Sequence, residues 1–173
     1  DVGENRVREA QEKFASLPAG VRRHMIGRFQ RNKARYAGTL FDWVHSVDRL
    51  ELAEELGRRM AGQGRTMDCL LQVNVSGEAS KAGVAPDALP EFAARVGQVP
   101  GLAVRGLMTI APLGADEREV RRTFAALREL SGRLAAAGVP GVEMRHLSMG
   151  MSDDFEIAIE EGATMVRVGT ALF

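Results

Sequence analysis

The order of short apolar runs and amphipathic helical patterns constrains the fold of this chain more than any other feature. Apolar, partly β-branched runs predict strands at residues 24–27, 41–47, 67–75, 104–111, 142–148 and 164–172. A seventh strand is expected to end at Val2. Amphipathic segments that predict helices lie between several of these strands. Repeated strand–helix order predicts a parallel sheet that is either open or closed into a barrel.

Helix start signals support this order. Asp48 is followed three residues later by Glu51, and Asp116 is followed in the same way by Glu119, so both aspartates are expected to be N-caps. Asn5 is expected to cap a helix near the start of the chain. No long linker or low-complexity tract interrupts the 173 residues. We therefore expect residues 1–173 to form a single domain.

The strand at 67–75 favours a barrel. In the segment DCLLQVNV, one face of the expected strand carries Gln72 and Asn74, and the other carries Cys69, Leu71, Val73 and Val75. The apolar face is expected to pack on helices, and the polar face to point into a barrel, near the carboxyl ends of its strands. Barrels of this type have eight strands and typically roughly 200 residues or more. The sequence therefore predicts an α/β fold of the TIM-type (β/α)8 barrel class that lacks its first strand–helix unit.

Composition excludes several classes of partner. The formal net charge is zero and the three histidines show no metal-ligand spacing, so we expect no nucleic acid and no metal. A basic cluster between Arg22 and Arg35 is interpreted as a solvated face. No apolar stretch has the length of a membrane span, and no signal peptide is visible. Cys69 is the only cysteine, which suits a reducing, cytoplasmic location.

An arginine lies inside the last predicted strand. In MVRVGTALF, residues 165–173, Arg167 is expected to face the barrel interior, where a guanidinium is costly without an acceptor. Gly169 lets a ligand approach the backbone closely, and Thr170 adds a hydroxyl and a backbone N–H. The alternative is a structural arginine paired with a carboxylate such as Glu143 or Glu156.

The segment before this strand adds a candidate anion site. The sequence SMGMS at 148–152 predicts a loop of small residues beside a short helix capped by Ser152 or Asp153. Barrels often bind phosphate with the loops after their last two strands. We therefore expect Ser148, Gly169 and Thr170 to bind a phosphate group. Asp153 and Asp154 are interpreted as favourable charges at a helix start.

Several segments together carry a resemblance to a known family. They are GENRVREAQEK, IGRFQRNK, HSVD, QVNVSGEASKAG, RGLMTIAP, LSMGMSDDFEIAI and VRVGTALF, and they cover nearly the whole chain. On these segments the chain resembles the pyridoxal 5′-phosphate (PLP) homeostasis protein family, the YggS or PROSC type.

The resemblance implies a barrel of PLP fold type III, similar to the N-terminal domain of alanine racemase, with PLP as cofactor. It implies that Arg167 faces the pyridine nitrogen, and that Ser148, with the Met149 amide, Gly169 and Thr170, binds the phosphate. Four further residues are expected near the ring or its linking groups: Asn5, Met25, Asn74 and Met108.

The lysine anchor of the family is not expected in this chain. Relatives hold PLP as a Schiff base with a lysine on the first barrel strand, upstream of the segment that matches GEN. The lysines present are Lys13, Lys33 and Lys81, and none occupies that motif. We therefore expect the sequence to be a portion of a longer protein.

The function implied is intracellular PLP homeostasis, as a carrier or regulator of the cofactor without catalytic turnover. PLP-dependent apo-enzymes are the expected recipients, and the expected state is a monomer or weak dimer. One alternative is a PLP-dependent racemase, whose relatives use a tyrosine from a second domain, whereas this chain has only Tyr36. The other is a barrel enzyme that acts on a phosphorylated metabolite.

Overall fold

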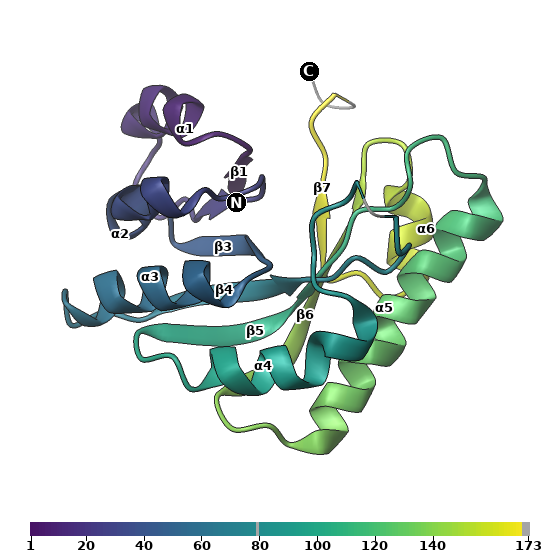
Figure 1. Ribbon diagram of the computed structural model, residues 1–173. Coiled ribbons are helices and arrows are strands. Elements are labelled where there is room, and N and C mark those ends of the chain that lie inside the picture. The colour runs from purple at the N-terminus through teal and green to yellow at the C-terminus, as the bar shows by residue number, and fades with distance from the viewer. Residues whose placement is uncertain (79, 171–173) are drawn as a thin grey trace.

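A computed structural model describes residues 1–78 and 80–170. Seven parallel strands form one sheet in chain order, with β1 and β7 at its two edges. The strands are β1 (Val2–Glu4), β2 (Arg23–Met25), β3 (Trp43–Val47), β4 (Met67–Gln72), β5 (Leu102–Met108), β6 (Val142–Met151) and β7 (Met165–Arg167). The sheet curls into a nearly closed barrel, which confirms the predicted fold class (Figure 1).

Helices connect successive strands. The α-helices are α1 (Val7–Lys13), α2 (Ala37–Leu40), α3 (Leu50–Ala61), α4 (Leu89–Gly97), α5 (Glu117–Ala137) and α6 (Phe155–Glu160). Short 3-10 helices lie at η1 (Phe14–Ser16), η2 (Arg31–Tyr36) and η3 (Pro86–Ala88). The long α5 runs along the outside of the sheet, beside β6 and α6 (Figure 1). Within the described residues, none of these helices combines the length and apolar character needed to cross a lipid bilayer.

Side chains that alternate along the strands belong to two separate apolar clusters, one on each face of the sheet. Cys69 and Leu71 of β4 belong to the main core, which also contains Leu52 and Leu56 of α3. Leu70, between them in sequence, belongs instead to a small cluster on the other face of the sheet. The members of that inner cluster are Trp43, Leu70 and Met108, with Met165 packed against them. Met165 of β7 therefore lies on the interior face of the sheet, as alternation along the strand requires if Arg167 also faces inward.

Among the first three predicted helix caps, one agrees with the structure and two differ. Asp116 caps α5, because its Oδ1 accepts from the Glu119 N–H at 2.8 Å. Asp48 does not cap α3: the helix begins at Leu50, and the Asp48 carboxylate accepts from the Arg49 side chain instead. Asn5 does not cap α1, whose N-cap is Arg6 without a side-chain hydrogen bond. A charged neighbour competes successfully for the carboxylate of Asp48.

Replacing the one confirmed cap should therefore have a measurable cost. We expect Asp116→Ala to lower the free energy of unfolding by about 1 kcal/mol, because the N–H of Glu119 loses its acceptor at the start of α5. Urea denaturation followed by circular dichroism measures the change. Asp116→Ser keeps a side-chain acceptor and should stay within a few tenths of a kcal/mol of the parent. Equal stability of the alanine and parent proteins would contradict the capping role.

The last strands end differently from the prediction. β6 continues to Met151, so the expected loop at 148–152 is largely strand. Gly150 within it has a φ of +92°, and a Cβ there would lie 2.5 Å from the Ala158 Cβ, so the strand lies tightly against α6. The N-cap of α6 is Asp154, not Ser152 or Asp153. β7 ends at Arg167, and the predicted strand end at 172 lies outside the described residues.

Candidate functional site

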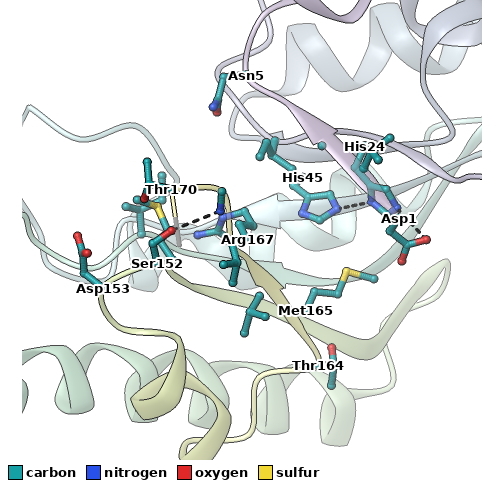
Figure 2. A pocket seen from close by; sticks show the side chains of 18 residues that line it. Asp1, Asn5, His24, His45, Ser152, Asp153, Thr164, Met165, Arg167 and Thr170 are labelled. Atoms are coloured by element: carbon teal, nitrogen blue, oxygen red, sulfur yellow. Dashed lines mark hydrogen bonds and ion pairs between the residues drawn. The ribbon is translucent and has the colours of Figure 1, made fainter. Parts of the chain in front are cut away.

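A cavity of about 640 Å³ lies between the two edge strands of the sheet. Val2 and Gly3 of β1 line one side, and all three residues of β7 line the other. His24 of β2 and His45 of β3 also line it, as does the segment 151–153, which begins at the last residue of β6. Figure 2 shows these side chains converging from strands that are far apart in sequence. The volume falls in the range of small-molecule sites, about 300 to 1,000 Å³.

Arg167 points inward from β7 and is one of the lining residues. Its Nη1 donates to the Ser148 Oγ at 2.6 Å, and its Nη2 donates to the Thr109 carbonyl oxygen at 2.9 Å. Burial lowers the pKa of the guanidinium to about 10, so it is charged at neutral pH. The sequence-based placement of Arg167 in the barrel interior agrees with this geometry.

No carboxylate forms an ion pair with Arg167 within residues 1–78 and 80–170. Glu143, one of the two partners considered from sequence, is paired with Arg105 and Arg145, each at 2.7 Å. The structural pairing with Glu143 is therefore wrong. A guanidinium has five N–H donors, and the two described hydrogen bonds use only two of them. This part of the cavity is a positive site with donors left for an acceptor on a ligand.

Small and hydroxyl-bearing residues lie beside the arginine. Gly169 and Thr170 line the cavity, and the Gly169 N–H donates to the Ser152 Oγ at 3.3 Å. A Cβ built on Gly169 would meet no heavy atom within 4 Å, so the space over this glycine is open. Ser152 and Asp153 line the same region (Figure 2). Backbone N–H groups and hydroxyls of this kind are suited to a phosphate oxygen.

Ser148 and Met149 are both fully buried, and neither lines the cavity. The Ser148 hydroxyl contacts Arg167 and also lies 3.0 Å from the His45 Nδ1. The Met149 side chain belongs to the main apolar core. Ser148 was expected to bind the phosphate, but its hydroxyl is occupied by the side chains of Arg167 and His45.

The four residues expected near the ring are dispersed. Asn5 lines the large cavity and also a neighbouring one of about 300 Å³. Asn74 lines only the smaller cavity, where its amide donates to the Glu78 carbonyl and accepts from the Gly77 N–H. Met25 lies in the main core, and Met108 lies in the inner cluster.

Two buried histidines belong to the site, although sequence analysis considered histidines only as metal ligands. His24 and His45 are 4% and 2% exposed, and their rings lie 2.9 Å apart between Nδ1 and Nε2. Burial lowers the pKa of His24 to about 4 and that of His45 to about 3. The sequence of β3 already indicated this position for His45. Alternation along the strand places His45 on the same face of the sheet as Trp43, and Val44 on the other face. No cluster suited to a metal ion occurs among the described side chains.

Comparison with known proteins gives consistent matches. The family described as alanine racemase, N-terminal domain, matches residues 1–173. A pyridoxal phosphate homeostasis protein from Pseudomonas aeruginosa is 48% identical over 176 residues, which cover 100% of this chain and 73% of that protein.

Solved structures match the fold equally well. PipY from Synechococcus elongatus, without PLP, superposes with a TM-score of 0.92 at 43% identity over 99% of this chain and 80% of PipY. PipY with PLP bound gives a TM-score of 0.88 at 42% identity, over the same shares of the two chains. Alanine racemase from Corynebacterium glutamicum, at 14% identity and a TM-score of 0.76, shares the fold over 99% of this chain and 47% of its own.

Proposed function

The chain belongs to the alanine racemase N-terminal domain family, and on that premise we propose that it binds PLP and serves PLP homeostasis as a carrier of the cofactor. Its similarity to proteins of that name and to the PLP-bound PipY structure supports the proposal. In this proposal residues 1–173 act as one ligand-binding domain. The protein holds and releases the cofactor without turning over a substrate.

The observation that carries the proposal is the charged guanidinium of Arg167 in the cavity wall, held only by neutral acceptors. PLP fits this donor set, because it offers an aromatic ring nitrogen as acceptor and a phosphate as anion. When bound, PLP supplies an electrophilic aldehyde. The open space over Gly169 leaves room for a phosphate at the backbone.

Each residue has a proposed part in holding the cofactor. Arg167 donates to the pyridine nitrogen and opposes its protonation, which makes the ring a weaker electron sink. Gly169 and Thr170 donate to the phosphate, with Ser152 beside them. Ser148 contacts Arg167 behind the cavity wall, and Met149 packs in the main core. The remaining proposed contacts to the ring or its linking groups are Asn5, Met25, Asn74 and Met108.

Tyr36, the only tyrosine within residues 1–173, lies in η2 and does not line the cavity, so it is not placed to act as a base there. The Tyr36 ring instead packs under the Arg35 guanidinium, at 4.9 Å from its centroid. We therefore propose PLP-dependent apo-enzymes as recipients of the cofactor. The proposed state of the carrier is a monomer or weak dimer.

The function is tested by comparing PLP with pyridoxal, which lacks the phosphate. We expect saturable PLP binding, followed by cofactor absorbance, and a pyridoxal affinity weaker by about hundredfold because the anion contacts are lost. Inorganic phosphate should compete with PLP. Addition of the loaded protein to a PLP-dependent apo-enzyme should restore its activity.

Three results would contradict the proposal. Equal affinities for PLP and pyridoxal would contradict the proposed phosphate contacts. Absence of saturable PLP binding would contradict PLP as the ligand and favour another phosphorylated ligand. Racemisation of amino acids by the loaded protein would show an enzyme in place of a carrier.

A further inference from the structure

A row of four polar side chains runs from the cavity wall through the barrel interior. The Arg167 Nη1 lies 2.6 Å from the Ser148 Oγ, which lies 3.0 Å from the His45 Nδ1. The His45 Nε2 then lies 2.9 Å from the His24 Nδ1. Figure 2 shows His45 between Arg167 and His24. The four residues come from β7, β6, β3 and β2, so the row crosses the barrel.

One set of hydrogen-bond directions gives every contact in this row a donor and an acceptor. An arginine side chain has donors only, so the Ser148 Oγ accepts from Arg167, and in this set the Ser148 hydroxyl donates its own proton to the His45 Nδ1. His45 therefore carries its proton on Nε2 and donates to the His24 Nδ1. His24 in turn carries its proton on Nε2. This set of tautomers satisfies all three contacts and leaves the His24 Nε2 without a hydrogen bond among the described residues, 3.9 Å from the Asp1 Oδ1.

The surroundings hold both imidazoles in place and neutral. His24 stacks on Trp43, with ring centroids 5.7 Å apart and planes 18° apart, and meets His45 edge-on at 5.0 Å. Burial lowers the pKa of both rings well below neutrality, so each imidazole is neutral at pH 7, with one ring nitrogen as donor and the other as acceptor. Ser148 is itself 0% exposed. The row is thus a rigid support that ends at the guanidinium.

We propose that His45 is a positioning residue for Arg167: acting through Ser148, it fixes the rotation of the guanidinium and so directs the remaining N–H donors into the cavity. The Thr109 carbonyl holds the second nitrogen, and the two contacts together define the plane of the group. A carboxylate in place of Ser148 would neutralise the charge, whereas this neutral row leaves it available to the ligand. Only the consequence for PLP rests on the proposed function; the orientation of Arg167 does not.

The orientation is tested without any ligand, by nitrogen NMR of the isotopically labelled full chain. We expect His45 and His24 to carry their protons on Nε2, and the Arg167 Nη groups to give separate signals because their rotation is restricted. In His45→Phe and Ser148→Ala the Arg167 Nη signals should merge. His45→Gln, whose side-chain oxygen accepts from Ser148, should keep them separate. His146→Gln changes a histidine outside the row and should have no effect.

The second readout is the affinity for PLP. If the proposed function holds, His45→Phe should weaken PLP binding by about tenfold, and His45→Gln should restore most of the loss. A His45 proton on Nδ1, or Nη signals unchanged in both Ser148→Ala and His45→Phe, would overturn the positioning role. If the Nη signals merge in His45→Phe and Ser148→Ala but the parent protein does not bind PLP, the positioning role is supported and the proposed function is rejected.

Discussion

Arg167→Glu is expected to weaken PLP binding by about hundredfold or more and to change the absorption spectrum of any cofactor still bound. The substitution replaces the donor to the ring nitrogen by a carboxylate, which raises the pKa of that nitrogen and favours its protonated form. The carboxylate also repels the phosphate across the same cavity.

The controls for this variant separate binding from folding. Arg167→Met removes the charge without adding a buried carboxylate, and it should lose affinity while keeping the thermal unfolding profile closer to that of the parent. Arg133→Met removes an exposed arginine on α5 and should bind PLP normally. A folded Arg167→Glu protein with unchanged affinity and spectrum would contradict contact between Arg167 and the ring.

Mild acid is the second condition with a large expected effect. The folded protein keeps His24 and His45 unprotonated, since burial lowers their pKa values to about 4 and about 3, whereas in the unfolded chain both have values near 6.5. Between these values the unfolded state binds more protons. The stabilising contribution is therefore complete above about pH 6.5 and is lost as the pH falls. We expect a loss of about 3 kcal/mol between about pH 6.5 and about pH 5.

Urea denaturation at a series of pH values measures this slope, in a window above the ordinary titration of carboxylates. His24→Phe removes one of the two imidazoles and keeps an aromatic ring against Trp43, so about half of the acid loss should disappear. Stability that does not change across the window would show that the two imidazoles are protonated as readily in the folded protein as in the unfolded chain.

Much of the fold was predictable because strand alternation and helix periodicity are local properties. Leu70 and Cys69 face opposite sides of β4 as a period of two requires, and Asp116 caps α5 as its spacing with Glu119 predicts. Element ends were less predictable. Asp48 has the same spacing to an acidic residue, but Arg49 captures its carboxylate, which is a contact that no capping pattern contains.

The candidate site was predictable only in part, for a related reason. Arg167 stood out because a cation in an apolar strand requires a partner or a ligand, whatever the tertiary structure. The contacts of Ser148 with both Arg167 and His45 depend on the register of β6 against its neighbours and on the closure of the barrel. A histidine in a buried strand does not by itself indicate a ligand site. The contacts of His45 with Ser148 and His24 follow only from the placement of their strands in the sheet.

The cavity lies between β1 and β7, which are the two edges of the sheet and share no backbone ladder in the part of the chain that the structure describes. A molecule that contacts Gly3 and Gly169 together would bridge β1 and β7. Occupancy would then restrain these two edge strands relative to each other, so that ligand capture and local rigidity become a single event.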